Sequence, residues 1–460
     1  MLIDIYGGWR RRTRIFLILL PDMIFKNIIG TAGTRLLNAV FSFAILLLIT
    51  NYIGSKGLGE ISLIMVDLTV IQLFVDWMAG SALVYFASRT QVSRLLVPAY
   101  LWILVILALF GVIGIGTHHL FPKAFAMVVP KGYEISILTL AFLNAFMQTH
   151  YNLLIGQKRI RQYNLIFSLQ ITSLIVFFSL FLFGFNDVTP LSYVNALTLA
   201  WGIGGILSFY QIIRKSEKFS LNGWHSLTGE IFQYGFQTQL SNVLHIGNKR
   251  LSFYLIRIFS GLSPLGIYSA GVQLTEGLRL IGQSISLVQF SAISNSREKE
   301  YARNLTIRLM KFSVSLTLLA LAVLLLIPQS VYQLVFSSAF GDIKAILTAL
   351  SVGVLALAAN TIFSHYFSGT GQPKINARAN LVGLIFTVIL LFILIPLWGY
   401  IGAAITASIS YSATFVYQAV LFKKQTQTAW GEWLIKATDF QEFYLLGKQL
   451  LTQKAQDETQ

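Results

Sequence analysis

The stretch NKRLSFYLIR, residues 248–257, places three cations inside a hydrophobic segment. Apolar sequence flanks it on both sides, QLSNVLHIG before it and IFSGLSPLGIYSAG after it. A helix of about 20 mostly apolar residues is long enough to cross a bilayer. A charge at the bilayer centre costs about 2.5–3.5 kcal/mol on insertion scales, so such residues usually face a partner or a water-filled cavity. The stretch therefore predicts a membrane-spanning helix with a polar, functional face.

The composition of the whole chain is that of a membrane protein. Of its 460 residues, 55% are hydrophobic and only 11% are charged, whereas soluble domains carry roughly 25% charged residues. The net charge of +16 does not indicate nucleic-acid binding, because Lys and Arg collect on the cytoplasmic loops of membrane proteins. The lack of cysteine excludes disulfides, thiolate metal sites and cysteine nucleophiles.

Hydrophobic segments separated by turn signals predict an all-α polytopic membrane protein with about twelve transmembrane helices. The turn signals are GSKGLG, HHLFPK, GQKRIR, FNDVTP, GLSP, SNSREKE, GTGQPK and PLWGY. The predicted spans are residues 28–50, 61–87, 96–117, 133–155, 163–185, 190–213, 231–258, 265–292, 305–327, 343–367, 376–396 and 400–422.

The distribution of basic residues predicts the orientation of these spans. With the N-terminus inside, the inner segments hold 25 of the 34 Lys and Arg residues, the outer loops hold four, and five lie within helices. Because cytoplasmic segments carry the excess of Lys and Arg, both termini are expected on the cytoplasmic side.

Two segments of the first half of the chain have counterparts in the second half. YIGSKGLGEIS (52–62) matches FSGLSPLGIYS (259–269) in two glycines, a leucine and a serine at a shift of 207, and GQKRIRQYN (156–164) resembles GQPKINARAN (371–380). A six-span unit returns the chain to its starting side, which predicts two six-helix bundles related by a parallel pseudo-two-fold repeat, with the substrate site between them.

This pattern predicts the domain organisation, and the tail includes an expected interfacial amphipathic helix. Trp433, Ala437, Phe440 and Tyr444 share a helical face there, which favours a surface anchor over a partner-binding motif. The predicted parts are a basic lead-in (1–27), an N-terminal bundle (28–213), a cytoplasmic linker (214–230), a C-terminal bundle (231–422) and the tail (423–460).

Charged residues within the spans are the candidate binding and coupling residues, because they are costly in lipid. The cations are Arg35, Lys249, Arg250, Arg257 and Arg279, and the acids are Asp67, Asp76 and Glu276. By helical spacing, Asn38 lies on the same polar helix face as Arg35. Asn242 and His245 likewise lie on the same face as Lys249. Even if every acid neutralises one cation, two cations remain, which predicts an anionic ligand.

Structural alternatives remain open for several of these residues. Glu276 can pair with Arg279 three residues later, and Asp67 or Asp76 can pair with Arg35. Arg257 near the outer end is equally explained by snorkelling to the interface.

No pattern in the chain indicates an enzyme or a cofactor. For His245 and His365, packing is favoured over a proton relay. No residue cluster has metal-ligand spacing, and no nucleotide-binding or hydrolase motif is present.

Four segments resemble the polysaccharide (O-antigen type) flippases of the multidrug/oligosaccharidyl-lipid/polysaccharide exporter superfamily. They are YIGSKGLGEISL, RLSFYLIRIFSGLSPLGIYSAG, GTGQPKINARANLVGL and IPLWGYIGAAITASIS, within a resemblance that covers about residues 26–422. The resemblance implies a V-shaped pair of bundles that work by alternating access. It also implies transfer of an undecaprenyl-pyrophosphate-linked oligosaccharide from the cytoplasmic to the outer leaflet of the bacterial inner membrane.

The resemblance also implies roles for individual residues and partners. By position, Arg35, Lys249, Arg250 and Arg279 match cations that hold the pyrophosphate or acidic sugars, with Asn38 and Asn242 beside them. Candidate coupling sites for H⁺ or Na⁺ are Asp67, Asp76, Glu276 and His245. Asn248 departs from the acidic residue that many relatives have there, which raises the local positive charge. Membrane lipids, a polysaccharide polymerase and chain-length machinery are the expected partners.

Three other functions remain as alternatives. Drug exporters of the same superfamily bind organic cations and need acids in the cavity, lipid II flippases usually have fourteen spans, and a glycan polymerase is expected to carry carboxylates on a large outer loop.

Overall fold

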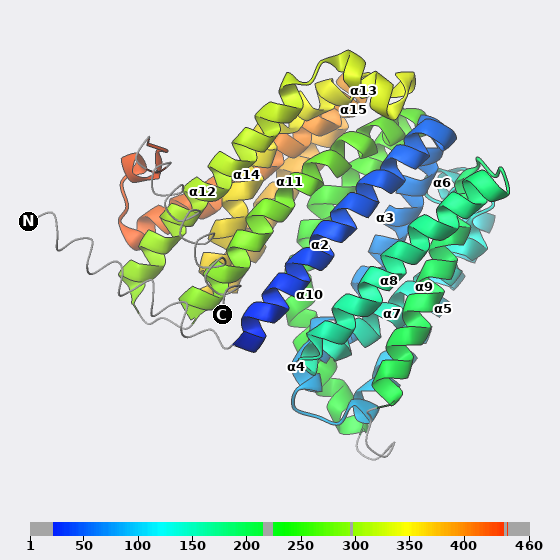
Figure 1. Cartoon of the computed structure of the whole chain (residues 1–460), viewed down its shortest axis with the longest axis horizontal. Coiled ribbons are helices and arrows are strands. Elements are labelled where there is room, and N and C mark those ends of the chain that lie inside the picture. Colours follow the sequence, from blue (N-terminus) through cyan, green and yellow to red (C-terminus); the bar gives the residue numbers. More distant parts are fainter. Residues whose placement is uncertain (1–21, 215–223, 295–297, 437–438, 440–460) are drawn as a thin grey trace, which may run out of the picture. The chain divides into compact units, whose positions relative to one another are not determined.

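The computed structural model describes residues 22–214, 224–294, 298–436 and 439. Within these residues the chain forms helices and no strand, and seven helical stretches are long and apolar enough to cross a membrane. The prediction of an all-α, multi-pass membrane protein is therefore confirmed, while the count of twelve spans and the two-fold repeat stay predictions. Figure 1 shows the helices in chain order.

Most of these helices are long, and short π or 3-10 helices (η1–η4) interrupt or follow them. Their bounds are α2 (Asp22–Leu48), η1 (Ile49–Ile53), α3 (Gly54–Ala79), α4 (Ser81–Ala87), α5 (Val92–Leu120), α6 (Pro122–Val128), α7 (Glu134–Gly156), α8 (Ile160–Ser179), η2 (Leu180–Gly184), α9 (Pro190–Ile213), α10 (Trp224–Phe259), α11 (Leu262–Ser294), α12 (Lys299–Leu326), α13 (Gln329–Phe336), η3 (Ser338–Phe340), α14 (Ile343–Gly369), α15 (Pro373–Thr426) and η4 (Trp430–Trp433).

The chain divides into two compact units that are interleaved along the sequence. Unit 1 comprises the chain up to Leu46, Val70–Ile115 and Glu134–Phe236. Unit 2 comprises Leu47–Thr69, Gly116–Tyr133 and the chain from Gln237 onward. These units do not coincide with the two predicted bundles, whose division at the linker stays a prediction.

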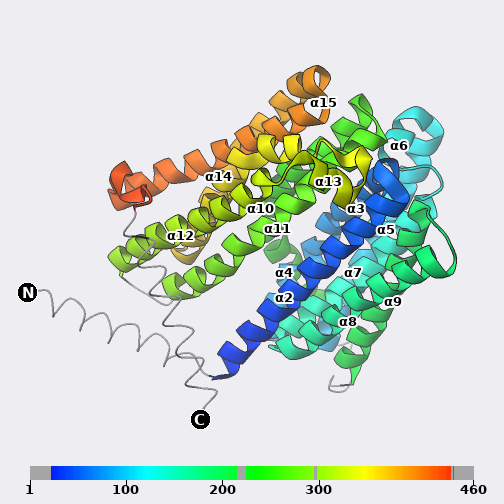
Figure 2. The same ribbon diagram turned by 45° about the horizontal axis from the view of Figure 1, so that its top comes forward.

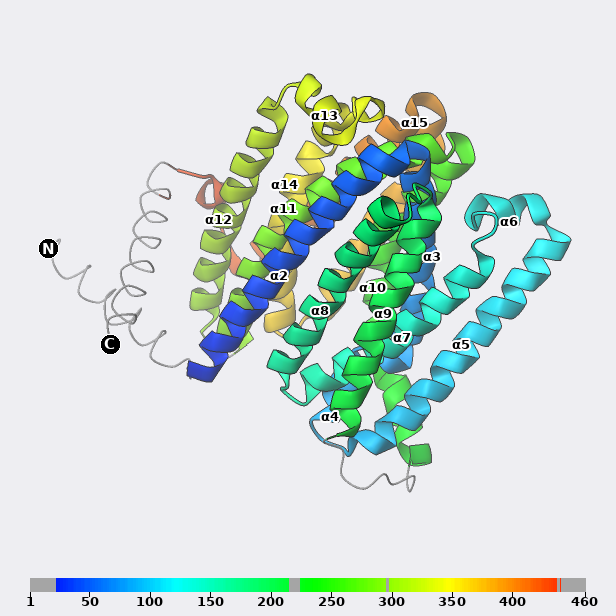
Figure 3. The same cartoon turned by 45° about the vertical axis from the view of Figure 1, so that its right-hand side comes forward.

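Unit 1 is built on α7, which contacts α4, α8 and α9 (Figure 3). Small residues permit this close packing. A Cβ atom added to Gly156 of α7 would lie 2.6 Å from the carbonyl oxygen of Val84 on α4. Gly204 of α9 similarly lies against Met147 of α7.

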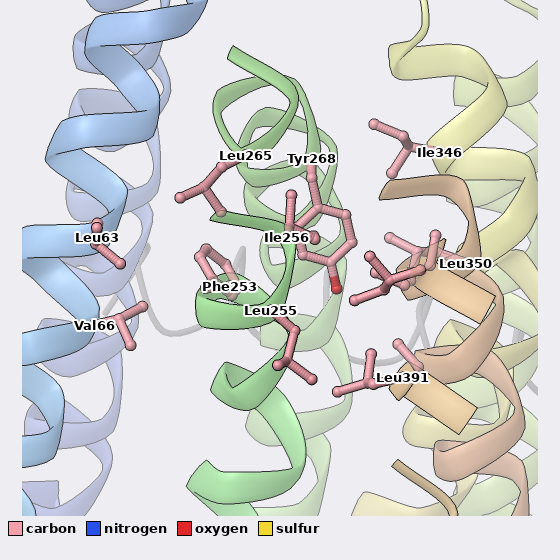
Figure 4. Close-up of a cluster of buried hydrophobic side chains, with 14 of the residues drawn as sticks. Leu63, Val66, Phe253, Leu255, Ile256, Leu265, Tyr268, Ile346, Leu350 and Leu391 are labelled. Carbon is pink, nitrogen blue, oxygen red and sulfur yellow. The ribbon is translucent and has the colours of Figure 1, made fainter. Parts of the chain in front are cut away.

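Unit 2 contains α11, α12 and α14 side by side, with α15 against α14 (Figures 1 and 2). Its largest described cluster of buried apolar side chains comes from α3, α10, α11, α14 and α15 (Figure 4). Phe253 and Ile256 of α10 lie in this cluster with Leu265 and Tyr268 of α11. Apolar packing thus holds together the two helices that carry most of the candidate binding residues.

Helix α15 is a helical hairpin and not one straight helix. Its backbone leaves the helical conformation at Gly399, where φ is +57° and ψ is −138°. The Thr387 hydroxyl oxygen on one arm lies 2.8 Å from the Ser410 hydroxyl oxygen on the other. The reversal falls within PLWGY, where the sequence predicts the turn between the last two spans.

The repeated segments 52–62 and 259–269 pack directly against each other. A Cβ atom added to Gly59 would lie 2.0 Å from the carbonyl oxygen of Leu262, and one added to Gly266 would lie 1.9 Å from that of Ser55. The two glycines are 207 positions apart, and so are the two contacted residues, Ser55 and Leu262. This is the same shift that relates the two segments in the sequence. Ser62 donates to its own counterpart Ser269 at 2.6 Å, so the contact is reciprocal.

Replacing Gly266 by alanine is expected to destabilise the protein, because the added methyl group overlaps backbone that cannot move independently. Overpacking of this kind costs about 1–3 kcal/mol. Gly277 on the same helix has no atom within 4 Å of an added Cβ, so Gly277→Ala should be neutral or stabilise by about 0.5–1 kcal/mol. Thermal unfolding of both variants in detergent checks this, and equal melting temperatures would contradict the contact.

Two predicted boundaries differ from the structure. Helix α2 begins at Asp22, inside the predicted lead-in, and α10 begins at Trp224, so the last seven residues of the predicted linker are helical. Residues 1–21 and 215–223 lie outside the described residues. Both helices thus begin before their apolar segments, because polar residues can form the first turns of a helix.

The sequence predicts that Trp433 lies in an amphipathic tail helix, but in the structure it is the last residue of a short 3-10 helix. Trp433 ends η4, and residues 434–436 are not helical. Its ring packs against Phe363 and Phe422, with centroids 5.4 and 5.7 Å away. Ala437, Phe440 and Tyr444 lie outside the described residues. The ring of Trp433 is thus held by protein aromatics.

Candidate functional site

Helices α10 and α11 bring three of the predicted residues together in unit 2. The Lys249 ammonium lies 3.2 Å from Glu276 Oε1, and Arg250 Nη2 lies 3.3 Å from the same oxygen and 3.5 Å from Oε2. Two adjacent cations on α10 therefore share one carboxylate on α11. Glu276 pairs across helices, and not with Arg279 as the spacing along α11 suggested.

The two cations differ in burial. The Lys249 side chain is 7% exposed, whereas the side chains of Arg250 and Glu276 are 26% and 29% exposed. A buried ammonium is stable only with a close counter-ion. Lys249 is therefore mainly the partner of Glu276, whereas Arg250 also keeps a solvent-accessible side.

Positive charge exceeds negative charge at this cluster. Arg279 is close enough for its charge to act on both Lys249 and Glu276, and within the described residues it forms no ion pair. Three cations facing one carboxylate leave two positive charges uncompensated. His245, one turn before Lys249 on α10, is close enough to sense all four of these charges.

A small cavity lies beside the ion pair. It is lined by Lys249 and Glu276 together with Tyr268, Thr275 and Tyr411 among others. The cavity has room for roughly one water molecule, so a pyrophosphate does not fit there. The partly exposed side chains of the cluster are those of Arg250, Glu276 and Arg279.

Asn248, which precedes the two cations, anchors α10 to both arms of α15. Its Oδ1 accepts hydrogen bonds from the hydroxyls of Thr387 and Ser410. Gly383 makes room for it, because an added Cβ atom would lie 2.5 Å from Asn248 Nδ2. The neutral amide is buried, 5% exposed, and its interactions fix the position of the Lys249–Arg250 pair.

The predicted coupling acids have different environments. Asp67 is buried in unit 2 and accepts a hydrogen bond from the Tyr254 hydroxyl at 2.6 Å. Asp76 lies in unit 1 and accepts a hydrogen bond from Gln72 at 2.7 Å. Gln72 in turn accepts one from Asn144 at 2.9 Å. Asp67 thus has a partner that sequence reasoning missed, since Tyr254 is 187 residues away.

The remaining predicted residues are not joined to the cluster by described contacts. Arg35 and Asn38 lie on α2 in unit 1, and the Arg35 side chain lies outside the described residues. Asn242 is exposed on α10 and donates to Gln239 at 2.9 Å. Arg257 is half-buried near the end of α10. Substrate-binding roles for these residues stay predictions.

One buried cation was missed. Lys311 of α12 is 8% exposed and pairs with Asp439 at 3.0 Å. The predicted span 305–327 contains it, yet the charge count assigned it to the cytoplasmic side. Its position between Met310 and Phe312 in an apolar run was the available signal.

No group of three or more His, Asp or Glu side chains in the described part of the chain is arranged to hold a metal ion. The charged side chains of α10 and α11 instead form a polar cluster with an excess of cations, within an all-helical, multi-pass membrane protein. The chain belongs to the polysaccharide biosynthesis protein family, whose model matches residues 24–285.

Curated relatives are similar over different lengths. The uncharacterized membrane protein MJ1068 of Methanocaldococcus jannaschii is 26% identical, over 55% of this chain and 52% of the relative. The probable low-salt glycan biosynthesis flippase Agl15 of Haloferax volcanii is 24% identical, over 48% and 46%. The chain thus spans about half the length of these two. The capsular polysaccharide biosynthesis protein CapF of Staphylococcus aureus is 22% identical, over 87% of this chain and 99% of CapF.

Solved structures share the fold. An inward-facing MATE multidrug transporter of the MOP superfamily has a TM-score of 0.68 at 15% identity, covering 85% of this chain and 94% of its own. The lipid II flippase MurJ in an inward closed conformation has a TM-score of 0.68 at 17% identity, covering 92% and 90%.

Proposed function

We propose that the protein is a flippase that moves a lipid-linked oligosaccharide, joined through pyrophosphate to undecaprenol, across the bacterial inner membrane. The observation that carries the proposal is the excess of positive charge at Arg250 and Arg279, which share with Lys249 a single carboxylate, that of Glu276. A pyrophosphate or an acidic sugar supplies the charge that this cluster lacks. Membership in a polysaccharide biosynthesis family, with relatives named for glycan and capsule synthesis, supports the same substrate class.

The sign of the charge argues against export of cationic drugs. Such ligands need acidic groups, whereas Glu276 is already shared by Lys249 and Arg250. The family and the fold of its structural neighbours also favour transport over an enzymatic activity. Arg35, Asn38 and Asn242 are the further candidate ligand residues, on α2 and α10.

Transport would follow alternating access. The reciprocal contact of α3 with α11 joins a segment of the first predicted bundle to one of the second, so parting of the bundles must open it. Asp67, Asp76, Glu276 and His245 are the candidate sites where H⁺ or Na⁺ would couple to this change. A polysaccharide polymerase and chain-length machinery would receive the product.

A flipping assay with the purified protein tests the proposal. Proteoliposomes receive a fluorescent undecaprenyl-pyrophosphate oligosaccharide, and a membrane-impermeant quencher reports which leaflet holds it. Faster transfer than in protein-free liposomes is expected, with no lengthening of the glycan. No transfer together with uptake of an organic cation such as ethidium would identify a drug exporter. Elongated glycan would identify a polymerase, and faster transfer of lipid II would identify a lipid II flippase.

A further inference from the structure

A second buried cation lies outside the α10–α11 cluster. Lys311 is 12 residues into α12, about 18 Å along the helix axis at 1.5 Å per residue, and α12 is one of the stretches long and apolar enough to span the membrane. Lys311 is 8% exposed. Because a buried ammonium is costly without a counter-ion, the source of its partner is informative.

The counter-ion comes from the tail and not from a neighbouring helix. Asp439, which follows the end of α15 and η4, places its two carboxylate oxygens 3.0 and 3.3 Å from the Lys311 ammonium. Partial burial raises the pKa of this carboxyl, but the backbone N–H of Lys436 and the Lys311 ammonium outweigh that effect and hold it below its usual value of 3.8. Asp439 is therefore charged at neutral pH. Glu276, by contrast, is part of the helical bundle.

A second ion pair attaches the tail to the same helix. Glu432 in η4 pairs with Arg303, eight residues before Lys311 on α12. Trp433 packs on the aromatic side chains of α14 and α15, and Lys423 lies 4.6 Å from the centre of the Trp430 ring. Figure 1 shows η4, in red, near the beginning of α12. Two carboxylates on one short segment thus meet two cations on one helix.

We propose that Arg303 and Lys311 form a phosphate-binding site on α12 that the tail carboxylates Glu432 and Asp439 occupy until a phosphate-bearing ligand displaces them. The ligand is the phosphate of an anionic lipid headgroup or a free pyrophosphate. This site goes beyond the proposed function, because it is separate from Arg250 and Arg279 and needs no transported glycan.

The energetics favour exchange over simple release. The more exposed pair, Arg303 with Glu432, contributes little, since exposed pairs contribute about 0–1 kcal/mol. Loss of Asp439 alone would leave Lys311 buried and unpaired, which costs more. A replacing anion removes that cost. Occupation of the site by phosphate therefore releases the tail, and docking of the tail empties the site.

Pulsed electron paramagnetic resonance tests the exchange, because the chain has no cysteine to interfere with spin labelling. Labels are attached at Asn304→Cys on α12 and Gly431→Cys in η4, both of which are exposed. In phosphatidylcholine vesicles a single short distance is expected. If lipid headgroups bind, phosphatidylglycerol in the vesicles should lengthen and broaden the distribution of distances between the labels. If free phosphate binds, millimolar pyrophosphate should have the same effect. An unchanged distance in both cases overturns the proposal.

Matched variants separate the ion pairs from general effects of charge. Lys311→Gln should give the long, broad distribution without added anion, whereas Lys424→Gln should behave like the parent, because Lys424 is exposed and forms no ion pair among the described residues. A short distance retained in Lys311→Gln would contradict the inference. If that variant does not fold, Asp439→Asn serves instead. It should bind radiolabelled pyrophosphate more tightly, on the order of tenfold, because one of the two competing tail carboxylates is lost. Unchanged binding would also overturn the proposal.

Discussion

Replacing Arg250 and Arg279 together by glutamine is expected to abolish glycan flipping while leaving the protein folded. Hydrogen bonds to charged groups contribute about 1.5–3 kcal/mol each. Loss of two such hydrogen bonds should therefore weaken pyrophosphate binding roughly a hundredfold or more. Glu276 keeps its closest partner, Lys249 at 3.2 Å, so the fold should persist. The proteoliposome flipping assay measures the loss, and size-exclusion chromatography with thermal unfolding reports the fold.

Three comparisons sharpen this prediction. Arg257→Gln, on the same helix seven residues beyond Arg250, should retain most activity. Arg250→Lys should retain part of it, because lysine keeps the charge but not the planar donor geometry. Lys249→Gln should mainly lower stability, by less than the 3–5 kcal/mol typical of breaking a buried pair, because Arg250 still faces Glu276. Full flipping by the Arg250 and Arg279 double variant would refute the assignment of these residues.

Joining Ser62 and Ser269 by a disulfide is expected to stop flipping almost completely. The two hydroxyl oxygens are 2.6 Å apart, close enough for cysteines at these positions to meet disulfide geometry. The absence of native cysteine leaves no other disulfide available. If the reciprocal α3–α11 contact must open in every cycle, oxidation of Ser62→Cys/Ser269→Cys should block transport and a reductant should restore it.

A second engineered disulfide is the matched control. Gly282→Cys/Ser313→Cys links α11 to α12, because a Cβ atom added to Gly282 would lie 3.2 Å from the Ser313 hydroxyl oxygen. Both positions lie in one predicted bundle, so this disulfide should leave most of the activity. Equal inhibition by both disulfides, or unimpaired flipping by the oxidised Ser62 and Ser269 variant, would rule out opening at this contact.

The turns of this fold are readable from the sequence because they depend on local chemistry. GSKGLG begins with Gly54 at a φ of +84°, PLWGY contains Gly399 at +57°, and FNDVTP contains Asn186 at +53°. Glycine and asparagine adopt such angles most readily. The hydrophobic character of the spans likewise follows from composition alone.

The partners of the charged residues are not readable in the same way. The sequence suggests Glu276 with Arg279, but the structure pairs Glu276 with Lys249 and Arg250. That choice depends on how α10 and α11 are rotated about their axes, which no single-helix pattern contains. The same reason explains the missed bond of Asp67 with Tyr254. The assignment of Lys311 to the cytoplasmic side has a different cause, because its apolar neighbours Met310 and Phe312 were readable from the sequence.

The contact between Gly59 and Leu262 is repeated, with the two segments exchanged, between Gly266 and Ser55. In such an arrangement one surface meets a copy of itself, as in a two-fold dimer of identical chains. The contact thus has the form by which two half-length subunits would associate before fusion into one chain. In such an ancestor a single substitution at the glycine would have appeared on both sides at once. In the predicted repeat, Lys249 and Arg250 correspond at the same shift of 207 to Ser42 and Phe43, a divergence that covalent joining would have permitted.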